Sequence, residues 1–242
     1  MFDDKFITLV NSAFRKSEEF YSNGLNQEKP NPFYIGFGNP NSKILIIGKE
    51  KGFDEANKKQ LQYESIDNPK EWLHYIKNKV GFNKEKHYET TEPYRNAYYP
   101  YNGKIKSGHT WNNYNKLTSG LLDKSDLFQN NLFLEHVFIT EINHEPSKNS
   151  KIRQFNDKTR IDFLKNDFYK SFKTTILACG NYLSNEKIEE IFNVEFYEYD
   201  SKPREKLLVS KNEKGDRKLI LTRQLSMDVR NEFITKLIQH LK

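Results

Sequence analysis

Four consecutive branched apolar residues, Ile44 to Ile47, constrain the fold of this chain more than any other segment. The turn-forming residues Pro40 and Asn41 come shortly before this run, and Gly48 follows it directly. A short uninterrupted apolar run is typical of a strand that is buried on both faces, as in a parallel sheet covered by helices. The sequence therefore predicts an α/β fold built around this strand.

Further apolar runs alternate with amphipathic segments along the chain, which is the pattern of a doubly wound α/β domain. Further strands are expected at about 136–141, 174–179, 194–199, 207–209 and 218–222. Helices are expected at about 1–20, 69–80, 110–122, 157–172, 185–192 and 228–241, with Thr110 as the cap of the third. We predict a three-layer sandwich in which helices flank a central, mainly parallel four-stranded sheet, with a C-terminal hairpin as an insertion. Residues 1–242 are expected to form a single domain, in which residues 1–41 supply an N-terminal helix and an irregular lead-in.

The formal net charge of +6 suits a polyanionic partner such as DNA. The same charge also arises when an AT-rich genome supplies many lysines that lie solvated on the surface, so charge alone does not decide between these interpretations. Cys179, the one cysteine, excludes an internal disulfide or a four-cysteine metal site within the chain, and it is expected to be buried. The six histidines show no metal-ligand spacing, so we expect no metal and no cofactor.

No stretch approaches the about 18–20 uninterrupted apolar residues that a membrane helix needs. The N-terminal residues also lack the basic region and apolar run of a secretory signal. We therefore expect a cytoplasmic protein that is monomeric and does not contact membranes.

Ligands of parallel α/β sheets bind beyond the carboxyl ends of the strands, so four loops are candidates for the site. The first of them, Gly48-Lys49-Glu50-Lys51-Gly52, places a carboxylate between two lysines and two glycines. Glu50 can orient or deprotonate a water molecule there, or it can be one end of an ion pair, for example with Arg223. The glycine spacing fits neither a Walker phosphate loop nor a dinucleotide-binding fingerprint.

Polar motifs follow in a set order along the rest of the chain. They are Thr110-Trp111-Asn112-Asn113 at the start of a helix, Glu141 and Asn143 after the second core strand, and Arg223-Gln224-Leu225-Ser226 before the final helix. Together with the first loop, and from Pro40 to the C-terminus, this order resembles the uracil-DNA glycosylase superfamily. The chain departs from the family pattern at three points: Lys51 replaces a proline, Glu141 stands where an asparagine is expected, and the last motif lacks its histidine.

The resemblance implies a DNA-base glycosylase that hydrolyses the N-glycosidic bond of a deaminated or modified base in DNA. Glu50 then occupies the water-activating position, while Arg223 and Gln224 meet the departing base. The resemblance further implies that Phe53 stacks on the base and that Glu141 and Asn143 bind its edge. A carboxylate at position 141 accepts a hydrogen bond from an amino group, which favours cytosine or adenine over uracil.

Contacts to the nucleic acid are expected from the loops and from the segment 94–106, which interleaves aromatic and basic residues. These residues are Lys49, Lys51, Gly52, Arg95, Tyr98, Tyr99, Lys104, Thr110, Asn113 and Ser226. Two alternatives remain open at this point. One is a catalytically inactive nucleic-acid-binding member of the same fold, and the other is an α/β enzyme that binds a small nucleotide through Lys49 and Lys51.

Overall fold

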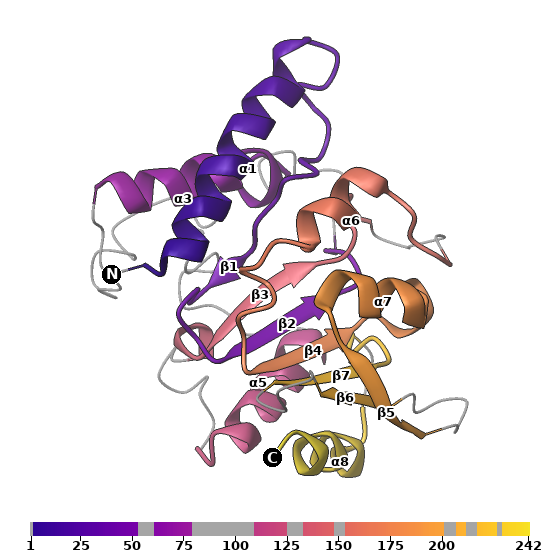
Figure 1. Ribbon diagram of the computed structural model, residues 1–242. Helices are drawn as coiled ribbons and strands as arrows, with labels where there is room; N and C mark the ends of the chain where they lie inside the picture. Colours follow the sequence, from indigo (N-terminus) through magenta and orange to yellow (C-terminus); the bar gives the residue numbers. More distant parts are fainter. Residues whose placement is uncertain are drawn as a thin grey trace.

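The structure is a computed structural model that describes residues 2–52, 61–78, 109–124, 133–147, 153–200, 207–211, 217–226 and 229–242. Its strands form one mixed sheet in the order β1-β3-β2-β4-β7-β6-β5 (Figure 1). The strand bounds are β1 Phe37–Gly38, β2 Ile44–Gly48, β3 Val137–Glu141, β4 Thr174–Ala178, β5 Glu195–Asp200, β6 Leu207–Lys211 and β7 Lys218–Thr222. The prediction of an α/β fold with a mostly parallel sheet is confirmed.

Parallel pairing joins the four central strands β3, β2, β4 and β7. The remaining pairings are antiparallel: β1 pairs with β3, and the β5–β6 hairpin pairs with β7 through β6. The sheet is therefore wider than the predicted four strands, because both the hairpin and β1 join it at its edges.

Strand β1 lies in the segment that the sequence predicted to be irregular. It consists of Phe37 and Gly38, so it is too short for hydrophobic alternation to reveal it. Gly36 and Gly38 both have positive φ, and a Cβ at either position would lie 2.4 Å and 2.5 Å from the carbonyl oxygens of Ile139 and Val137, respectively. The pairing depends on the close approach of two backbones, which glycine permits.

The helices are α1 Asp4–Ser22, α3 Asn68–Lys77, α5 His109–Leu121, α6 Lys158–Leu164, α7 Asn185–Phe192 and α8 Asn231–Leu241. Short helical turns are η1 Gln62–Ile66, η3 Phe133–Glu135 and η4 Gly180–Tyr182. Helix α1 packs against α3, and α5 packs against α8 (Figure 1).

Helices cover both faces of the sheet, as two neighbouring strand residues show. Phe138 of β3 packs against Phe6 of α1 and Trp72 of α3, with ring centroids 6.0 Å and 6.1 Å away. Phe37, which pairs with Ile139, instead packs against Trp111 of α5 at 5.6 Å. Since successive strand residues point to opposite faces, α1 and α3 lie on one face and α5 lies on the other.

Some of the predicted helices differ from the observed ones in their bounds, and α8, for example, begins at Asn231 rather than near residue 228. Helix α6 ends at Leu164 rather than near residue 172, because the chain turns at Asn166, whose Oδ1 accepts from the backbone of Phe168 at 2.9 Å. Helix α5 begins at His109, so Thr110 lies inside the first turn and is not its cap.

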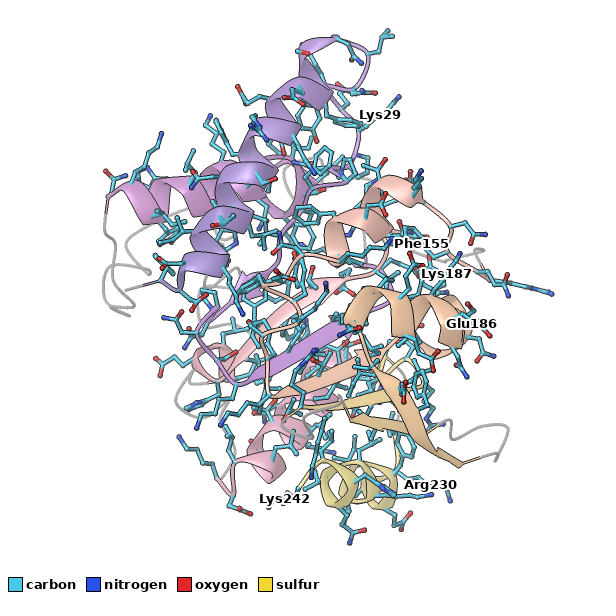
Figure 2. The ribbon with its side chains drawn as sticks, in the orientation of Figure 1. Lys29, Phe155, Glu186, Lys187, Arg230 and Lys242 are labelled. Carbon is cyan, nitrogen blue, oxygen red and sulfur yellow. The ribbon has the colours of Figure 1, made fainter. Side chains whose placement is uncertain are left out.

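Helix α7 is fixed to the segment that leads into α6. Lys187 donates to the carbonyl oxygen of Phe155 at 3.4 Å and to the side chain of Asn156, and Figure 2 shows Phe155 and Lys187 next to each other. Phe155 stacks on Tyr182 with a centroid distance of 5.5 Å.

Among the described residues, no helix combines the length and the hydropathy that crossing a membrane requires.

Candidate active site

The carboxyl ends of the four parallel strands lie in one row. Gly48 pairs with both Glu141 and Ala178, and Ala178 pairs with Thr222. Because the last residues of these strands are paired, the four candidate loops begin next to one another, at the edge where ligands of such sheets bind.

The loops after β2 and β3 stay paired beyond the ends of their strands. Backbone amides of Ile142, Asn143 and Ser147 donate to the carbonyl oxygens of Gly48, Lys49 and Lys51 at 2.9–3.0 Å. The Glu141 side chain folds over Gly48, because a Cβ at position 48 would lie 2.0 Å from Oε2 of Glu141. Gly48 thus has a steric role: it leaves the space that the buried carboxyl group of Glu141 fills.

Glu50 carries a carboxylate whose side chain is only 5% exposed. Its Oε1 lies 3.7 Å from Nζ of Lys49, which is an ion pair too long to be a hydrogen bond. Its Oε2 is buried and has no hydrogen-bond partner within the described part of the chain. The ammonium of Lys49 also lies 4.6 Å from the centroid of the Tyr182 ring. One oxygen of Glu50 is therefore left for a ligand or a water molecule.

Lys51 was predicted to contact nucleic acid, but its side chain is mostly buried, with 14% of it exposed. Its Nζ donates to the carbonyl oxygen of Glu64 at 2.8 Å and lies 3.5 Å from Oε2 of the same residue. It also lies 4.0 Å from the centroid of the Tyr34 ring. Burial lowers the pKa of the Lys51 ammonium, an effect that Glu64 and Glu141 oppose. Because its charge is engaged by Glu64, Lys51 is not available to a phosphate in this conformation.

Glu141 was expected to act as a carboxylate, and its surroundings change that expectation. Burial raises the pKa of Glu141 to about 8; Lys51 and Arg160 oppose the rise, while Glu50 and Glu64 add to it. The group is therefore mostly protonated at neutral pH and can donate as well as accept a hydrogen bond.

Arg160 of α6 is fully buried and holds the lead-in segment against the end of β3. Its guanidinium donates to the carbonyl oxygens of Pro32 (3.3 Å), Tyr34, Glu141 (2.6 Å) and Ile142 (3.3 Å) and to Oγ1 of Thr140 (3.1 Å). The sequence analysis did not single this residue out. A usable signal was present, since Arg160 shares a helix face with the apolar residues Phe163 and Leu164 three and four positions later.

A small pocket opens between these loops, with an enclosed volume of about 10 Å³, roughly the room of one water molecule. Its lining residues are Tyr34, Lys51, Leu61, Glu64, Ser65, Glu141, Asn143, His144 and Pro146. Glu64 reaches this pocket from η1 and was missed by the sequence analysis, because nothing in its local pattern marks it as buried.

Asn113 and Asn143 were predicted to contact the nucleic acid and the base, but their side chains hold loops together. Asn113 is 4% exposed, and its Nδ2 donates to the carbonyl oxygen of Leu225 at 2.9 Å. Asn143 donates to the hydroxyl of Tyr182 at 3.2 Å and accepts from the backbone of Glu145 at 2.9 Å. The amide of Asn113 is therefore not presented to a ligand in this conformation, whereas Asn143 lines the small pocket.

The last loop places Arg223 against the final helix. Its Cζ lies 4.6 Å from the centroid of the Phe233 ring, and its buried Nε has no hydrogen-bond partner among the described residues. Gln224 is exposed and Ser226 is half-buried. No ion pair joins Glu50 to Arg223 within the described ranges, and neither residue lines the small pocket.

Other predicted site residues differ in how far the structure describes them. Gly52 is exposed, and Thr110 is half-buried in the first turn of α5. Phe53, Arg95, Tyr98, Tyr99 and Lys104 lie outside the described residues. Cys179 is 3% exposed, and burial raises the pKa of its thiol to about 12, so the prediction that it is buried is confirmed.

Comparisons with known proteins leave the site to be interpreted from its own geometry. No model of a protein family, no curated protein and no solved structure matches the chain. In the part of the chain that the structure describes, no group of three or more His, Cys, Asp or Glu residues is arranged to hold a metal ion.

The raised pKa of Glu141 predicts a pH-dependent stability. The unfolded chain releases this proton near the usual glutamate pKa of 4.5, whereas the folded protein keeps it until about pH 8. The free energy of unfolding should therefore fall as pH rises between these values, and Glu141→Gln should remove this loss. We expect Glu141→Gln to gain about 3–4 kcal/mol relative to wild type between pH 5 and pH 8, measured by urea unfolding.

The matched control for this measurement is Glu145→Gln, which changes an exposed glutamate of the same loop. Its stability should follow the wild-type curve across the pH range. If the Glu141→Gln curve also ran parallel to wild type, the carboxyl group would not be held protonated in the folded state.

Proposed function

We propose that the protein is a DNA-base glycosylase that hydrolyses the N-glycosidic bond of a deaminated or modified base in DNA. The observation that carries this proposal is the Glu50 carboxylate, which lies just beyond the carboxyl end of the central strand β2 and has a buried oxygen without a hydrogen-bond partner among the described residues. The four parallel central strands, with polar loops at one edge, support it further because a mainly parallel sheet with its site at that edge is what the resemblance to the uracil-DNA glycosylase superfamily implies.

Cleavage of this bond places positive charge on the sugar and negative charge on the departing base. In the proposed reaction, the water oxygen bonds to the anomeric carbon of the sugar, and Glu50 accepts the water proton. The base leaves with the electron pair of the broken bond. Glu50 also stabilises the cationic sugar. The Nε of Arg223, which has no hydrogen-bond partner in the described part of the chain, donates to the anionic base. The exposed side chain of Gln224 is the second proposed donor to that base.

The base has to leave the helical stack before this chemistry begins, which costs a few kcal/mol. Glu141 is proposed to bind its edge, since the carboxyl group lies at the end of β3, beside Gly48. The proposed phosphate contacts are Lys49, Gly52, Thr110 and Ser226, because Lys51 and Asn113 are engaged within the protein.

A panel of single- and double-stranded oligonucleotides with different deaminated and modified bases tests this proposal. We expect at least one base to be released, scored as an alkali-labile abasic site, with no release from the undamaged strand. Salt-dependent binding of every oligonucleotide without any release would contradict it and would favour the inactive binding protein. Binding of a mononucleotide without oligonucleotide affinity would favour the small-nucleotide enzyme, although burial of Lys51 removes one of the two lysines on which that alternative depends.

A further inference from the structure

Three buried polar atoms that line the small pocket have no hydrogen-bond partner among the described residues. They are Oε1 of Glu64, Oε2 of Glu141 and Nδ1 of His144. Glu64 and Glu141 are only 6% and 9% exposed, so bulk water does not readily satisfy them. Leaving a buried polar group unsatisfied costs about 1–3 kcal/mol. Three such atoms on the wall of one pocket indicate a site that a polar group fills.

The chemistry of these atoms selects a group that donates hydrogen bonds. Glu64 lies 3.5 Å from the Lys51 ammonium, and as a carboxylate it offers its Oε1 only as an acceptor. Burial lowers the pKa of His144 to about 4, with Arg160 adding to the effect and Asp157 opposing it, so the neutral ring can accept at one nitrogen. The neighbouring Lys51 ammonium disfavours a cation in the pocket. A neutral group with more than one N–H therefore suits these acceptors.

The dimensions of the pocket limit the size of that group. The volume of about 10 Å³ in this partly open pocket accommodates one water molecule or one group of similar size, such as an amino group. A whole heterocycle does not fit in this volume, so its ring has to stay outside while one substituent enters.

We propose that this pocket, lined by Glu64, Glu141 and His144, is the subsite that receives the exocyclic amino group of the substrate base. This inference rests on the proposed function and names its substrate class: a modified base that keeps an amino group next to an unprotonated ring nitrogen, the arrangement found in cytosine and adenine. The amino group donates to Glu64 and His144, and the O–H of the Glu141 carboxyl donates to the ring nitrogen. A base with a carbonyl at the same position, such as uracil or hypoxanthine, places an oxygen against the Glu64 carboxylate, which disfavours binding.

Binding of free bases tests the subsite without requiring any bond cleavage. Cytosine is compared with uracil, and adenine with hypoxanthine, by ligand-observed NMR titration of the wild-type protein up to the solubility limit of each base. We expect the amino base of at least one pair to bind about tenfold more tightly than its carbonyl counterpart. Equal affinities, a preference for the carbonyl bases or no binding of any base would overturn the proposal.

Glu64→Gln is the variant that identifies the group responsible for the preference. The glutamine amide can turn its NH2 group toward a carbonyl, so the preference for the amino base should fall about tenfold or reverse. Glu145→Gln, an exposed change in the same loop as His144, should keep the wild-type preference. If Glu64→Gln does not fold, His144→Phe, which removes a ring acceptor of a half-buried residue that lines the pocket, provides the same comparison. An unchanged preference in the folded variant would contradict the assignment.

The two proposals fail in different ways. Preferential binding of amino bases without release from any oligonucleotide would retain the subsite and exclude the glycosylase. Release of uracil or hypoxanthine at the same rate as amino bases would retain the glycosylase and exclude the subsite.

Discussion

Replacement of Arg160 by methionine is expected to lower the free energy of unfolding by about 4 kcal/mol. The guanidinium is fully buried and donates to five acceptors, four of which are backbone carbonyl oxygens. Methionine can fill the space of the aliphatic stem, but it leaves these acceptors without a donor in a region that water does not reach. Guanidinium chloride unfolding at neutral pH measures the loss.

Arg153→Met is the matched control, because Arg153 is exposed at the start of the same described range. It should change the free energy of unfolding by no more than about 0.5 kcal/mol. Arg160→Lys should fall between wild type and Arg160→Met, since an ammonium keeps the charge but cannot reach acceptors on both the lead-in segment and β3. A loss below about 1 kcal/mol for Arg160→Met would show that the lead-in segment does not depend on this guanidinium.

Conversion of Glu50 to glutamine is expected to slow base release by about 10²–10⁴-fold, since the amide cannot accept the proton of the attacking water. The same change should have little effect on stability. The Oε2 atom has no hydrogen-bond partner to lose among the described residues, and the ion pair with Lys49 at 3.7 Å is long. Single-turnover kinetics are measured on the oligonucleotide from which the wild-type protein releases a base. Together with thermal unfolding, they separate a slower chemical step from a loss of folding.

Glu232→Gln serves as the control for this experiment. It removes one exposed carboxylate on α8, so it changes the net charge of the protein by the same amount as Glu50→Gln does. Its rate of base release should match wild type. A folded Glu50→Gln protein that released the base at the wild-type rate would exclude Glu50 as the acceptor of the water proton.

Arg160 also affects the small pocket, because its charge acts on Glu141 and His144, which line that pocket. Arg160 contributes to both groups: it opposes the rise in the pKa of Glu141 and adds to the fall in the pKa of His144. Loss of Arg160 should therefore change the hydrogen-bonding states at the pocket as well as the stability of the fold. Arg160→Met therefore tests how the fold and the pocket are held together, whereas Glu50→Gln tests the chemical step at the same edge of the sheet.

The core strands and the order of the loops were predictable from the sequence. Runs such as Ile44–Ile47 are apolar at every position, and a segment of this kind lowers its free energy by burial on both faces whatever its neighbours are. Once strands and helices alternate, parallel pairing brings the carboxyl ends of the strands to one edge. The positions of Glu50 and Glu141 at that edge therefore followed from local patterns.

Burial of individual charges was not predictable in the same way. Lys51, Glu64 and Arg160 are polar in any local pattern, and their burial depends on partners from distant segments, such as the carbonyl oxygens of the lead-in loop. A charge enters the interior only when folding supplies those partners, because the desolvation penalty otherwise excludes it. The same dependence on distant groups explains why Glu141 holds its proton and why strand β1, with Gly36 and Gly38, pairs with the distant strand β3.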